Sequence, residues 1–205
     1  MSRYTGPRLK VLRALGVDLP GLSRKSMQER SQPPGQHGAR KVAARKSEFG
    51  LQLMEKQKLR YNYGLTERQL RRVVTDAKRH RGATGAKMVE LLERRLDNLV
   101  FRAGFAPTIP AARQLVSHGH FQLNGKRVTI PSIRLRVGDS FGPTEAGGKI
   151  DLVRFTLEAP SLERPEWIGF DGSTQTARLS HLPDGDSAPF PLDLQRVVEY
   201  YATRM

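Results

Sequence analysis

The amino-acid sequence predicts an α+β fold. We expect a helical N-terminal lobe with a basic extended arm, then a helix-turn-helix hairpin followed by a small β-sheet, and a C-terminal helix that docks back on the helical lobe. Three observations predict this order. Between residues 48 and 117 apolar residues recur every three or four positions, as on one face of a helix. From Phe121 they alternate with polar residues, as in strands, and a last helical stripe follows Asp193.

The arm comprises residues 1–47, which are basic and are often interrupted by glycine and proline. Only Leu9, Leu12 and Leu15 recur at a helical spacing, so we expect one short helix in an arm too polar to bury a core alone. Ordering each backbone residue costs roughly 1–2 kcal/mol. The arm is therefore expected to become ordered mainly when an anionic partner neutralises it.

Two helices with clear capping signals follow the arm. Ser47 is a plausible N-cap and Gly64 a plausible C-terminal glycine for the first helix. Thr66 begins the second helix, and Gln69 three residues later completes a capping box. This second helix has two unlike faces. Its apolar stripe is Leu70, Val73, Val74 and Ala77, and the opposite face carries Arg68, Arg71, Arg72 and Arg79. A helix face whose charges are all positive favours contact with phosphate over simple exposure to solvent.

A third helix is expected from Thr84 to residue 103, ending at Gly104, and a fourth from Thr108 to Gly119, with a link between them short enough to force a helical hairpin. Asn124-Gly125 is then a strong two-residue turn signal for a β-hairpin. Further strands are predicted at 133–137, 149–155 and 176–180. Asp193 caps the terminal helix, whose stripe is Leu194, Val197, Val198 and Tyr201.

The net charge indicates an anionic partner. The 205 residues carry a formal net charge of +15, and residues 1–100 hold 23 basic and 9 acidic groups, against 12 and 11 in the remainder. Such an excess repels itself unless an anion neutralises it, and a polyphosphate is the usual partner. A merely soluble basic surface is the alternative.

The absence of cysteine excludes disulfides, thiolate zinc sites and a cysteine nucleophile, and it suits a reducing cytosol. No apolar run approaches the ~20 residues of a membrane span, and no apolar signal-peptide core follows Met1. We therefore expect a cytoplasmic chain.

Several motifs resemble those of a known family. Four of them look like an S-four RNA-binding domain: Arg94-Arg95-Leu96-Asp97-Asn98, Arg113-Gln114-Leu115-Val116, His118-Gly119-His120 and Asn124-Gly125-Lys126-Arg127-Val128. Three more lie nearer the N-terminus: Tyr4 to Pro7, Gln32-Pro33-Pro34-Gly35-Gln36-His37-Gly38 and Glu55-Lys56-Gln57-Lys58-Leu59. Together, over nearly the whole chain, they are similar to the bacterial small-subunit ribosomal protein S-four family.

The resemblance implies a non-enzymatic structural constituent of the small ribosomal subunit. Such proteins bind 16S rRNA directly and early, nucleate assembly of the subunit body, and contact ribosomal protein S-five at an interface tied to translational accuracy. It also implies an arm at 1–47, a helical lobe at 48–86 with the C-terminal helix at 192–205, and a second lobe at 87–191 that contains the S-four domain at about 94–157.

The RNA-contact residues that the resemblance and the charge pattern imply are mostly cationic or hydrogen-bonding. They are Arg3, Tyr4, Gln36, His37, Arg40, Lys41, Lys56, Lys58, Arg60, Arg68, Arg71, Arg72, Arg113, Ser117, His118, His120, Asn124, Gly125, Lys126 and Arg127.

The chain departs from many relatives in two places. Those relatives carry a four-cysteine zinc knuckle in the arm, whereas here Leu9 and Leu12 occupy the positions of the first pair. We therefore expect a form without zinc or any other cofactor. Relatives also often have basic residues after the cap at Thr108, where this chain has Ile109-Pro110, which puts phosphate contact by that turn in doubt.

Two decoy motifs invite other functions. Gly138-Asp139-Ser140-Phe141-Gly142 matches the G-x-S-x-G of serine hydrolases, with His181 downstream, but that chemistry needs a strand-to-helix elbow, and Pro143 and Gly147-Gly148 argue against a helix there. A turn at a strand edge is the simpler role. His118 and His120 offer only two of the three or four ligands that zinc requires, so hydrogen bonding to phosphate or within a turn is favoured.

Two further classes remain as alternatives. An RNA-modifying enzyme that carries an S-four module, such as a pseudouridine synthase, would need a catalytic domain, and only about 50 residues follow Phe155. A helix-turn-helix regulator of DNA would usually dimerise and would not need the arm and hairpin in this order. Binding to rRNA against duplex DNA separates these readings.

Overall fold

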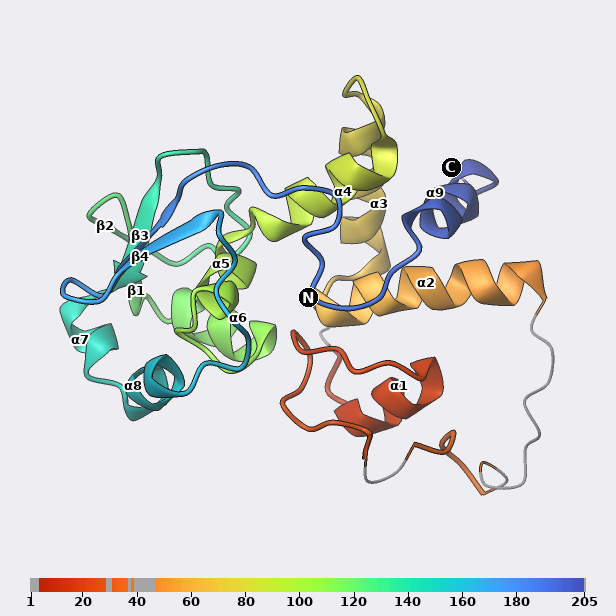
Figure 1. The fold of residues 1–205 in the computed structure, drawn as a ribbon, viewed down its shortest axis with the longest axis horizontal. Helices are drawn as coiled ribbons and strands as arrows, with labels where there is room; N and C mark the ends of the chain where they lie inside the picture. Colours follow the sequence, from red (N-terminus) through yellow and green to blue (C-terminus); the bar gives the residue numbers. More distant parts are fainter. Residues whose placement is uncertain (1–3, 29–30, 37, 39–46, 205) are drawn as a thin grey trace. The chain divides into compact units, whose positions relative to one another are not determined.

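The computed structural model describes residues 4–28, 31–36, 38 and 47–204 (Figure 1). The chain divides into two compact units: a helical unit, Met1–Met88 with Ala188–Met205, and a sheet unit, Val89–Ser187. The helical unit contains α1 (Arg8–Leu15), α2 (Glu48–Asn62), α3 (Glu67–Lys78) and α9 (Leu194–Ala202), and α4 (Thr84–Glu93) runs from it into the sheet unit. The sheet unit contains α5 (Leu96–Arg102), α6 (Ile109–Ser117), β1 (Phe121–Leu123), β2 (Lys126–Val128), β3 (Ser140–Pro143), α7 (Glu145–Gly148), α8 (Asp151–Glu158), β4 (Ile168–Asp171) and β5 (Thr176–Leu179).

The capping residues of α2 and α3 act as the sequence predicts. The Ser47 side chain accepts the Gly50 N–H at the start of α2. Thr66 and Gln69 form a complete capping box at the start of α3, in which each side chain accepts the other residue's backbone N–H. The stripe of α3 is buried, with Leu70, Val74 and Ala77 fully inaccessible. The arginines are thereby left on the opposite face.

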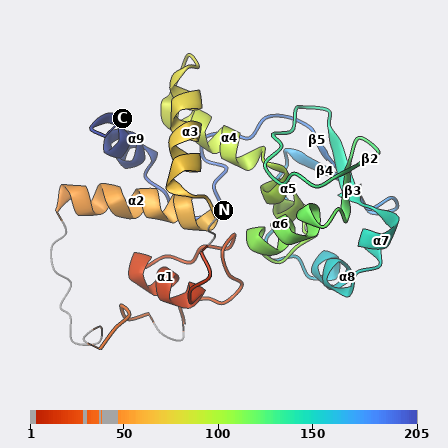
Figure 2. The ribbon, with the colours of Figure 1, turned by 180° about the vertical axis from the view of Figure 1, so that it is seen from behind.

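Helix α9 packs along α2, as expected from its apolar stripe (Figure 1, Figure 2). The Asp193 side chain caps α9 by accepting the Arg196 N–H, and Val197 and Tyr201 are fully buried. Polar contacts fix the register: a Glu55 carboxylate oxygen accepts the Asp193 N–H at 3.1 Å. The C-terminal helix is therefore part of the core of the helical unit.

Residues 8–22 bury more apolar surface than the sequence predicts for the arm. Leu12 and Leu19 are fully inaccessible and Leu22 nearly so. The Gly21 N–H donates to the buried Asn62 side-chain oxygen of α2 at 2.9 Å, which ties this segment to the helical unit. These residues are buried together with the helical unit and do not form a core alone, but the burial of Leu19 and Leu22 was not predicted, because they follow α1 without helical spacing.

The single helix predicted from residue 84 to 103 is wrong, because it is broken into α4 and α5. Arg95 adopts an extended conformation with ψ 138°. The N–H groups of Leu96 and Asp97 donate to the carbonyls of Ile133 and Pro131, at 2.8 and 3.0 Å, instead of to the preceding helical turn. A chain segment about 35 residues later in the sequence thus supplies the hydrogen bonds that the continuous helix would have made.

The small sheet is antiparallel, in the order β2-β1-β3-β5-β4. β1 and β2 form the predicted hairpin, with Leu123 opposite Lys126 and both turn residues, Asn124 and Gly125, at positive φ. The buried face of the sheet packs against Phe105, whose ring centroid lies 5.5 Å from that of Phe121 and 6.3 Å from that of Phe141. This core supports α6 and the hairpin.

The other strand predictions have mixed outcomes. β5 confirms the strand at 176–180, whereas 133–137 forms no strand and has one isolated bridge, from Arg134 to Arg95. The segment 149–155 is not a strand, because α8 covers 151–158 and buries Val153 and Thr156, which are three apart. Within the decoy motif Ser140 begins β3, and the one-turn helix α7 follows it, contrary to the expectation that no helix starts there.

Among the described residues, no helix is long and apolar enough to cross a membrane.

Candidate nucleic-acid interface

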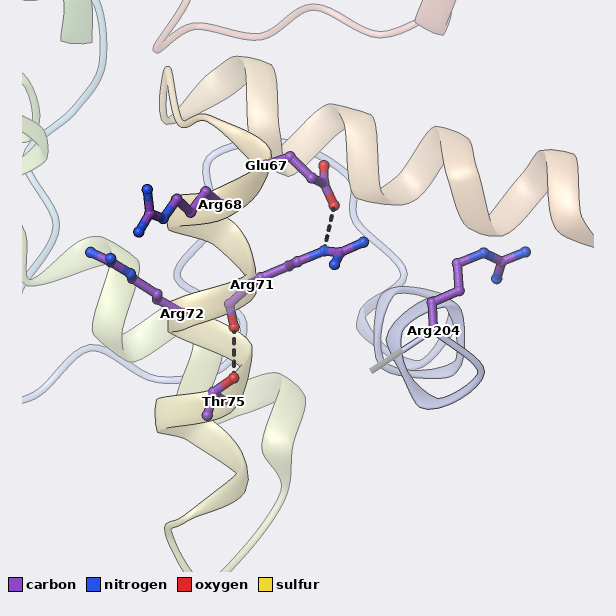
Figure 3. Close-up of a pocket in the computed structure, with 6 residues that line it drawn as sticks. All are labelled: Glu67, Arg68, Arg71, Arg72, Thr75 and Arg204. Atoms are coloured by element: carbon purple, nitrogen blue, oxygen red, sulfur yellow. Dashed lines mark hydrogen bonds and ion pairs between the residues drawn. The ribbon is translucent and has the colours of Figure 1, made fainter. Parts of the chain in front are cut away.

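The exposed face of α3 in the helical unit carries several arginines. Arg68, Arg71 and Arg72 are all exposed, opposite the buried stripe. They line an open basin of about 640 Å³ (Figure 3), defined here as the arginine basin. Its lining residues are Glu67, Arg68, Arg71, Arg72, Thr75 and Arg204. In Figure 3 the side chains of Arg68 and Arg72 leave α3 on one side, and that of Arg71 leaves it on the other, toward α9.

Glu67 is the one acidic side chain that lines the basin, and its charge is compensated. The Lys56 Nζ lies 2.9 Å from Glu67 Oε2, and the Tyr201 hydroxyl donates to Glu67 Oε1 at 2.8 Å. Burial alone would raise the pKa of Glu67, but the hydrogen bonds from Lys56 and Tyr201 and the positive charges of Lys56 and Arg60 outweigh it, so the pKa is lowered. Glu67 is therefore ionised at neutral pH and is paired with Lys56, which leaves the basin strongly positive.

The Tyr201 hydroxyl is a hydrogen-bond donor to Glu67 at neutral pH. Burial, followed by the hydrogen bond to and negative charge of Glu67, raises the pKa of the Tyr201 hydroxyl far above its ordinary value. The hydroxyl thus links the end of α9 to the first turn of α3. This hydrogen bond fixes the C-terminal end of α9, and Arg204 lies two residues after that helix ends.

Lys56 and Lys58, both predicted RNA contacts, lie inside the helical unit. Their exposed fractions are 5% and 8%, too small for a direct grip on phosphate. Lys58 pairs with Glu55 at 2.6 Å and donates to the Pro191 carbonyl at 3.4 Å. The structure thus gives both lysines the role of joining α2 to its neighbours, because Lys56 is paired with Glu67 of α3 and Lys58 donates to the Pro191 carbonyl.

Tyr4 and Arg60, two other predicted contacts, come together around one ring. The Arg60 guanidinium carbon lies 4.6 Å from the Tyr61 ring centroid, and the Tyr4 ring meets the same ring edge-on at 5.3 Å. Tyr4 is 44% exposed. An exposed ring such as that of Tyr4 can stack on an unpaired base or lie against a ribose-phosphate backbone. Gln36, another predicted contact, is exposed.

In the sheet unit, the C-terminal end of α6 and the β-hairpin form one surface, defined here as the hairpin surface. Ser117 and His118 are exposed at the end of α6, and Lys126 is exposed on β2. Arg127 joins the two elements, because its Nε donates to the Gly119 carbonyl at 3.0 Å and its Nη2 to the His118 carbonyl at 3.2 Å. Four predicted contacts are therefore brought together.

Gly119 makes this junction possible. Its φ is +76°, in the left-handed region that ends α6, and a Cβ there would overlap the Arg127 guanidinium. The adjacent His118 and His120 rings lie 6.1 Å apart between centroids. Among the residues that the structure describes, no group of three or more His, Asp or Glu side chains could hold a metal ion.

The hairpin turn itself is held by hydrogen bonds. The Asn124 side chain donates to Asp139 Oδ1 and accepts the Ser140 N–H, both at 2.9 Å. Gly125 has open space around it, so its backbone is accessible to a partner. Asn124 thus shapes the turn that presents Gly125 and Lys126.

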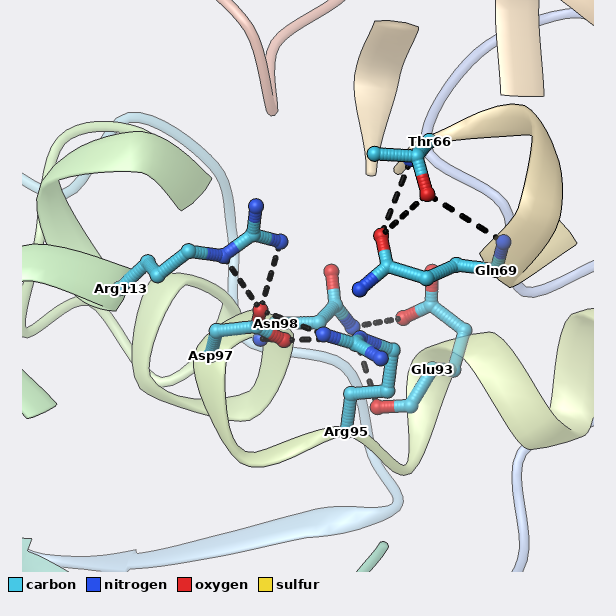
Figure 4. A network of polar contacts seen from close by, with 7 residues as sticks. All are labelled: Thr66, Gln69, Glu93, Arg95, Asp97, Asn98 and Arg113. Carbon is cyan, nitrogen blue, oxygen red and sulfur yellow. Dashed lines mark hydrogen bonds and ion pairs between the residues drawn. The ribbon is translucent and has the colours of Figure 1, made fainter. Parts of the chain in front are cut away.

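Arg113, one of the predicted RNA contacts, does not project freely from α6. Its Nε and Nη2 donate to Asp97 Oδ2 at 3.0 and 2.8 Å (Figure 4). Asp97 is fully buried and also accepts two bonds from Arg95 and one from the Asn98 N–H. The Arg113 side chain is 29% exposed, so only its outer edge faces solvent. Its first role is to neutralise a buried carboxylate.

Four predicted contacts lie outside the described residues, and one contact candidate was missed. The four are Arg3, His37, Arg40 and Lys41. The missed residue is Arg204, which lines the arginine basin from the C-terminal end of the chain. Its place after an amphipathic helix was visible in the sequence, but nothing there indicates which surface that helix brings it to.

Comparison with known proteins finds a matching family model for the N-terminal part of the chain and another for the part that contains the hairpin surface. Residues 3–93 match the family model "Ribosomal protein S4/S9 N-terminal domain", and residues 94–141 match the "S4 domain". The chain is 60% identical to "Small ribosomal subunit protein uS4" of Methylobacillus flagellatus and 59% identical to "Small ribosomal subunit protein uS4B" of Nitrosomonas europaea, in each case over the full length of both proteins. It is 90% identical to "Ribosomal protein uS4-like" of Azoarcus sp. over 108 residues, which are 53% of this chain and 94% of that protein.

Full-length identity at this level, together with two family models that meet at residue 94, leaves a single assignment. The chain belongs to the uS4 family of small ribosomal subunit proteins.

Proposed function

We propose that this chain is a structural component of the small ribosomal subunit that binds 16S rRNA directly. In this proposal it binds early, nucleates assembly of the subunit body, and contributes to translational accuracy through ribosomal protein S-five. It works in the cytoplasm as part of the ribosome, without a cofactor and without catalysis. The full-length relatives bear small-subunit names, which supports this function over an RNA-modifying enzyme with an S-four module.

The observation that carries the RNA-binding part is the arginine face of α3. Three arginines project from a capped helix whose other face is buried, and the acid among them is already paired with Lys56. A-form RNA hides its base edges in a deep major groove, so a protein reads its shape through phosphates and riboses. Arginines fixed along a rigid helix suit that task, because each fork can grip phosphate through two parallel N–H bonds.

The hairpin surface provides a second set of contacts in this proposal. Lys126 and His118 flank Arg127, which the carbonyls of His118 and Gly119 hold in place. The helical lobe of residues 48–86 and the S-four domain at about 94–157 would each bring one preformed cationic surface to the RNA. The arm, residues 1–47, would add Tyr4, which meets the Tyr61 ring beside Arg60 of α2.

The test compares RNA targets and charge-removal variants of the full chain. Binding to naked 16S rRNA and to a duplex DNA of equal length is measured by filter retention, and contacts are mapped by hydroxyl-radical footprinting. We expect one protected rRNA region, and roughly tenfold weaker binding for Arg68→Ala/Arg72→Ala. Arg154→Ala, which removes an exposed charge on α8, is the matched control and should bind as wild type. Equal affinity for duplex DNA and rRNA, without a defined footprint, would reject the proposal.

A further inference from the structure

We propose that Arg13 is a positioning residue for RNA binding. Its guanidinium holds the arm turn, defined here as residues 31–36 and 38, against α1, and so fixes the place from which the exposed Gln36 meets the RNA. The inference rests on the proposed rRNA binding and deepens it, because it names the contact that sets this part of the arm before any RNA is bound. The partner is the rRNA strand that lies along the arm turn.

Two hydrogen bonds join Arg13 to the arm turn. Arg13 Nε donates to the Gln32 carbonyl at 2.8 Å, and Nη2 donates to the Pro33 carbonyl at 3.3 Å. The two donors belong to one planar guanidinium, and the two acceptors are consecutive in the chain. The pair of bonds therefore fixes the direction of the turn as well as its distance from α1, since a turn held at a single point could still rotate.

Arg13 stands on a helix that is itself fixed. Val11, Leu12 and Leu15 of α1 are buried, so the helix cannot shift without opening the core of the helical unit. A side chain that projects from a rigid element places its partner more exactly than one that projects from a loop. The bonds from Arg13 thus transfer the position of the helical unit to the arm turn.

The arm turn is closed at the carbonyl that Arg13 binds. The Gly38 N–H donates to the Gly35 carbonyl at 3.2 Å. Gly38 is buried, and a Cβ there would overlap the Pro33 carbonyl oxygen, so the chain doubles back closely on Pro33. The Pro33 carbonyl is therefore the point at which the start of the turn, its end and the Arg13 side chain meet.

A second polar contact holds the chain between α1 and the arm turn. Asp18 Oδ2 accepts the Ser26 hydroxyl at 2.5 Å, and Oδ1 accepts the Met27 N–H at 2.9 Å. This contact does not involve Arg13 and acts on residues that precede the turn. Loss of Arg13 should therefore release the arm turn while the preceding segment stays in place, which separates a loss of position from a loss of folding.

The experiment is directed cleavage of 16S rRNA by probes on the full-length chain, which contains no cysteine. An iron–EDTA probe is attached at Ser31→Cys, exposed at the start of the arm turn, and separately at Thr129→Cys, exposed directly after β2. With Arg13 present, each probe should cut its own defined stretch of rRNA. Arg13→Gln should weaken the cuts from position 31 about fivefold and spread them, because the turn is no longer aimed, and should leave the cuts from position 129 unchanged.

Two variants separate position from charge. Lys10→Gln is the matched control, because it removes the same charge from an exposed side chain of α1, and it should leave both sets of cuts unchanged. Arg13→Lys keeps the charge without the planar fork and should behave like Arg13→Gln. Cuts from position 31 that fade equally in Lys10→Gln, or that Arg13→Lys restores fully, would overturn the inference.

The remaining outcomes separate the inference from the proposed function. Unchanged cuts from position 31 in Arg13→Gln would overturn the inference, and so would their absence in the Arg13 protein while the probe at position 129 cuts; the proposed function stands in both cases. Cuts that fade from both positions in Arg13→Gln, together with a lowered melting temperature, would reveal a folding defect and overturn the inference as well. No defined cut from either probe with Arg13 present would overturn both.

Discussion

At the scale of single residues, the basic side chains of this chain fall into two classes. Lys56, Lys58 and Arg113 are paired with acids that are buried or partly buried, whereas Arg68 and Arg72 face solvent. The sequence alone assigned all five to RNA. It could not separate the classes because the Asp97 that engages Arg113 lies on another helix, and the Glu67 that engages Lys56 follows a turn. Only the tertiary structure shows which charges are already neutralised.

Arg113→Ala should therefore lower stability more than a surface substitution does. Asp97 would lose two of its hydrogen bonds but keep those from Arg95, so we expect a loss of about 1–3 kcal/mol in the free energy of unfolding. Urea unfolding measures it. Lys126→Ala, which removes an exposed charge, should cost less than about 0.5 kcal/mol. Equal stabilities of the two variants would show that Arg113 is not needed to neutralise Asp97.

The lowered pKa of Glu67 makes a pH prediction. A carboxyl whose folded pKa lies below its unfolded value contributes stability that is present above the unfolded pKa and is lost as the pH falls through the folded pKa. The stability difference between wild type and Glu67→Gln should thus be constant near neutral pH and shrink below about pH 4–5. Urea midpoints across pH 3 to 7 measure this, and a difference that grows on acidification would contradict the pairing with Lys56 and Tyr201.

At the scale of elements, local signals predicted the fold wherever the element is set by its own residues. The caps at Ser47, Thr66 and Asp193 and the Asn124-Gly125 turn are all in place, because each uses a neighbour within four residues. The break between α4 and α5 depends on carbonyls of the segment 131–133, and no local pattern reveals it. The helix α8 was missed because its apolar residues occupy both the buried and the exposed faces.

Two glycines with the same φ separate backbone strain from side-chain overlap. Gly119 and Gly125 both have φ +76°, but only at Gly119 would a Cβ meet the Arg127 guanidinium. Both alanine variants should lose about 1–2 kcal/mol from the left-handed conformation. Gly119→Ala should lose additional stability and weaken rRNA binding, since Arg127 must leave the carbonyls of His118 and Gly119. The two variants are compared by their melting temperatures and by their affinities for rRNA. Equal values for Gly119→Ala and Gly125→Ala would show that the contact between Gly119 and Arg127 contributes neither to stability nor to RNA binding.

At the scale of the whole molecule, the sequence predicted that the candidate site binds RNA, but it did not predict all of the residues that form the site. The basic first half indicated RNA, and the one-sign face of α3 indicated where. Arg204 could not be predicted, because 132 residues separate it from Arg72 and only the packing of α9 on α2 brings it to the basin. The burial of Leu19 was equally hidden, since it contacts the helical unit without any periodic pattern.

That burial predicts how the N-terminal segment behaves without RNA. The amides of Leu12, Leu15 and Leu22 should exchange slowly with solvent in the free protein, because these residues lie in the core of the helical unit and the adjoining Gly21 N–H is bonded to Asn62. Hydrogen exchange followed by mass spectrometry measures this. Asn62→Ala should speed exchange in this segment and leave the buried residues Leu96–Arg102 of α5 protected. Fast exchange of the segment in the wild type would show that it folds only on RNA.

The central claim is that preformed cationic surfaces of this protein neutralise rRNA phosphates. The most direct test is the salt dependence of binding to 16S rRNA for the wild type and for Arg68→Ala/Arg71→Ala/Arg72→Ala. Each neutralised phosphate releases a counterion, so wild-type affinity should fall on the order of a thousandfold between 50 and 200 mM salt, and the variant should lose roughly two to three from the slope. A wild-type affinity that does not change with salt, or a variant with the wild-type slope, would contradict the account.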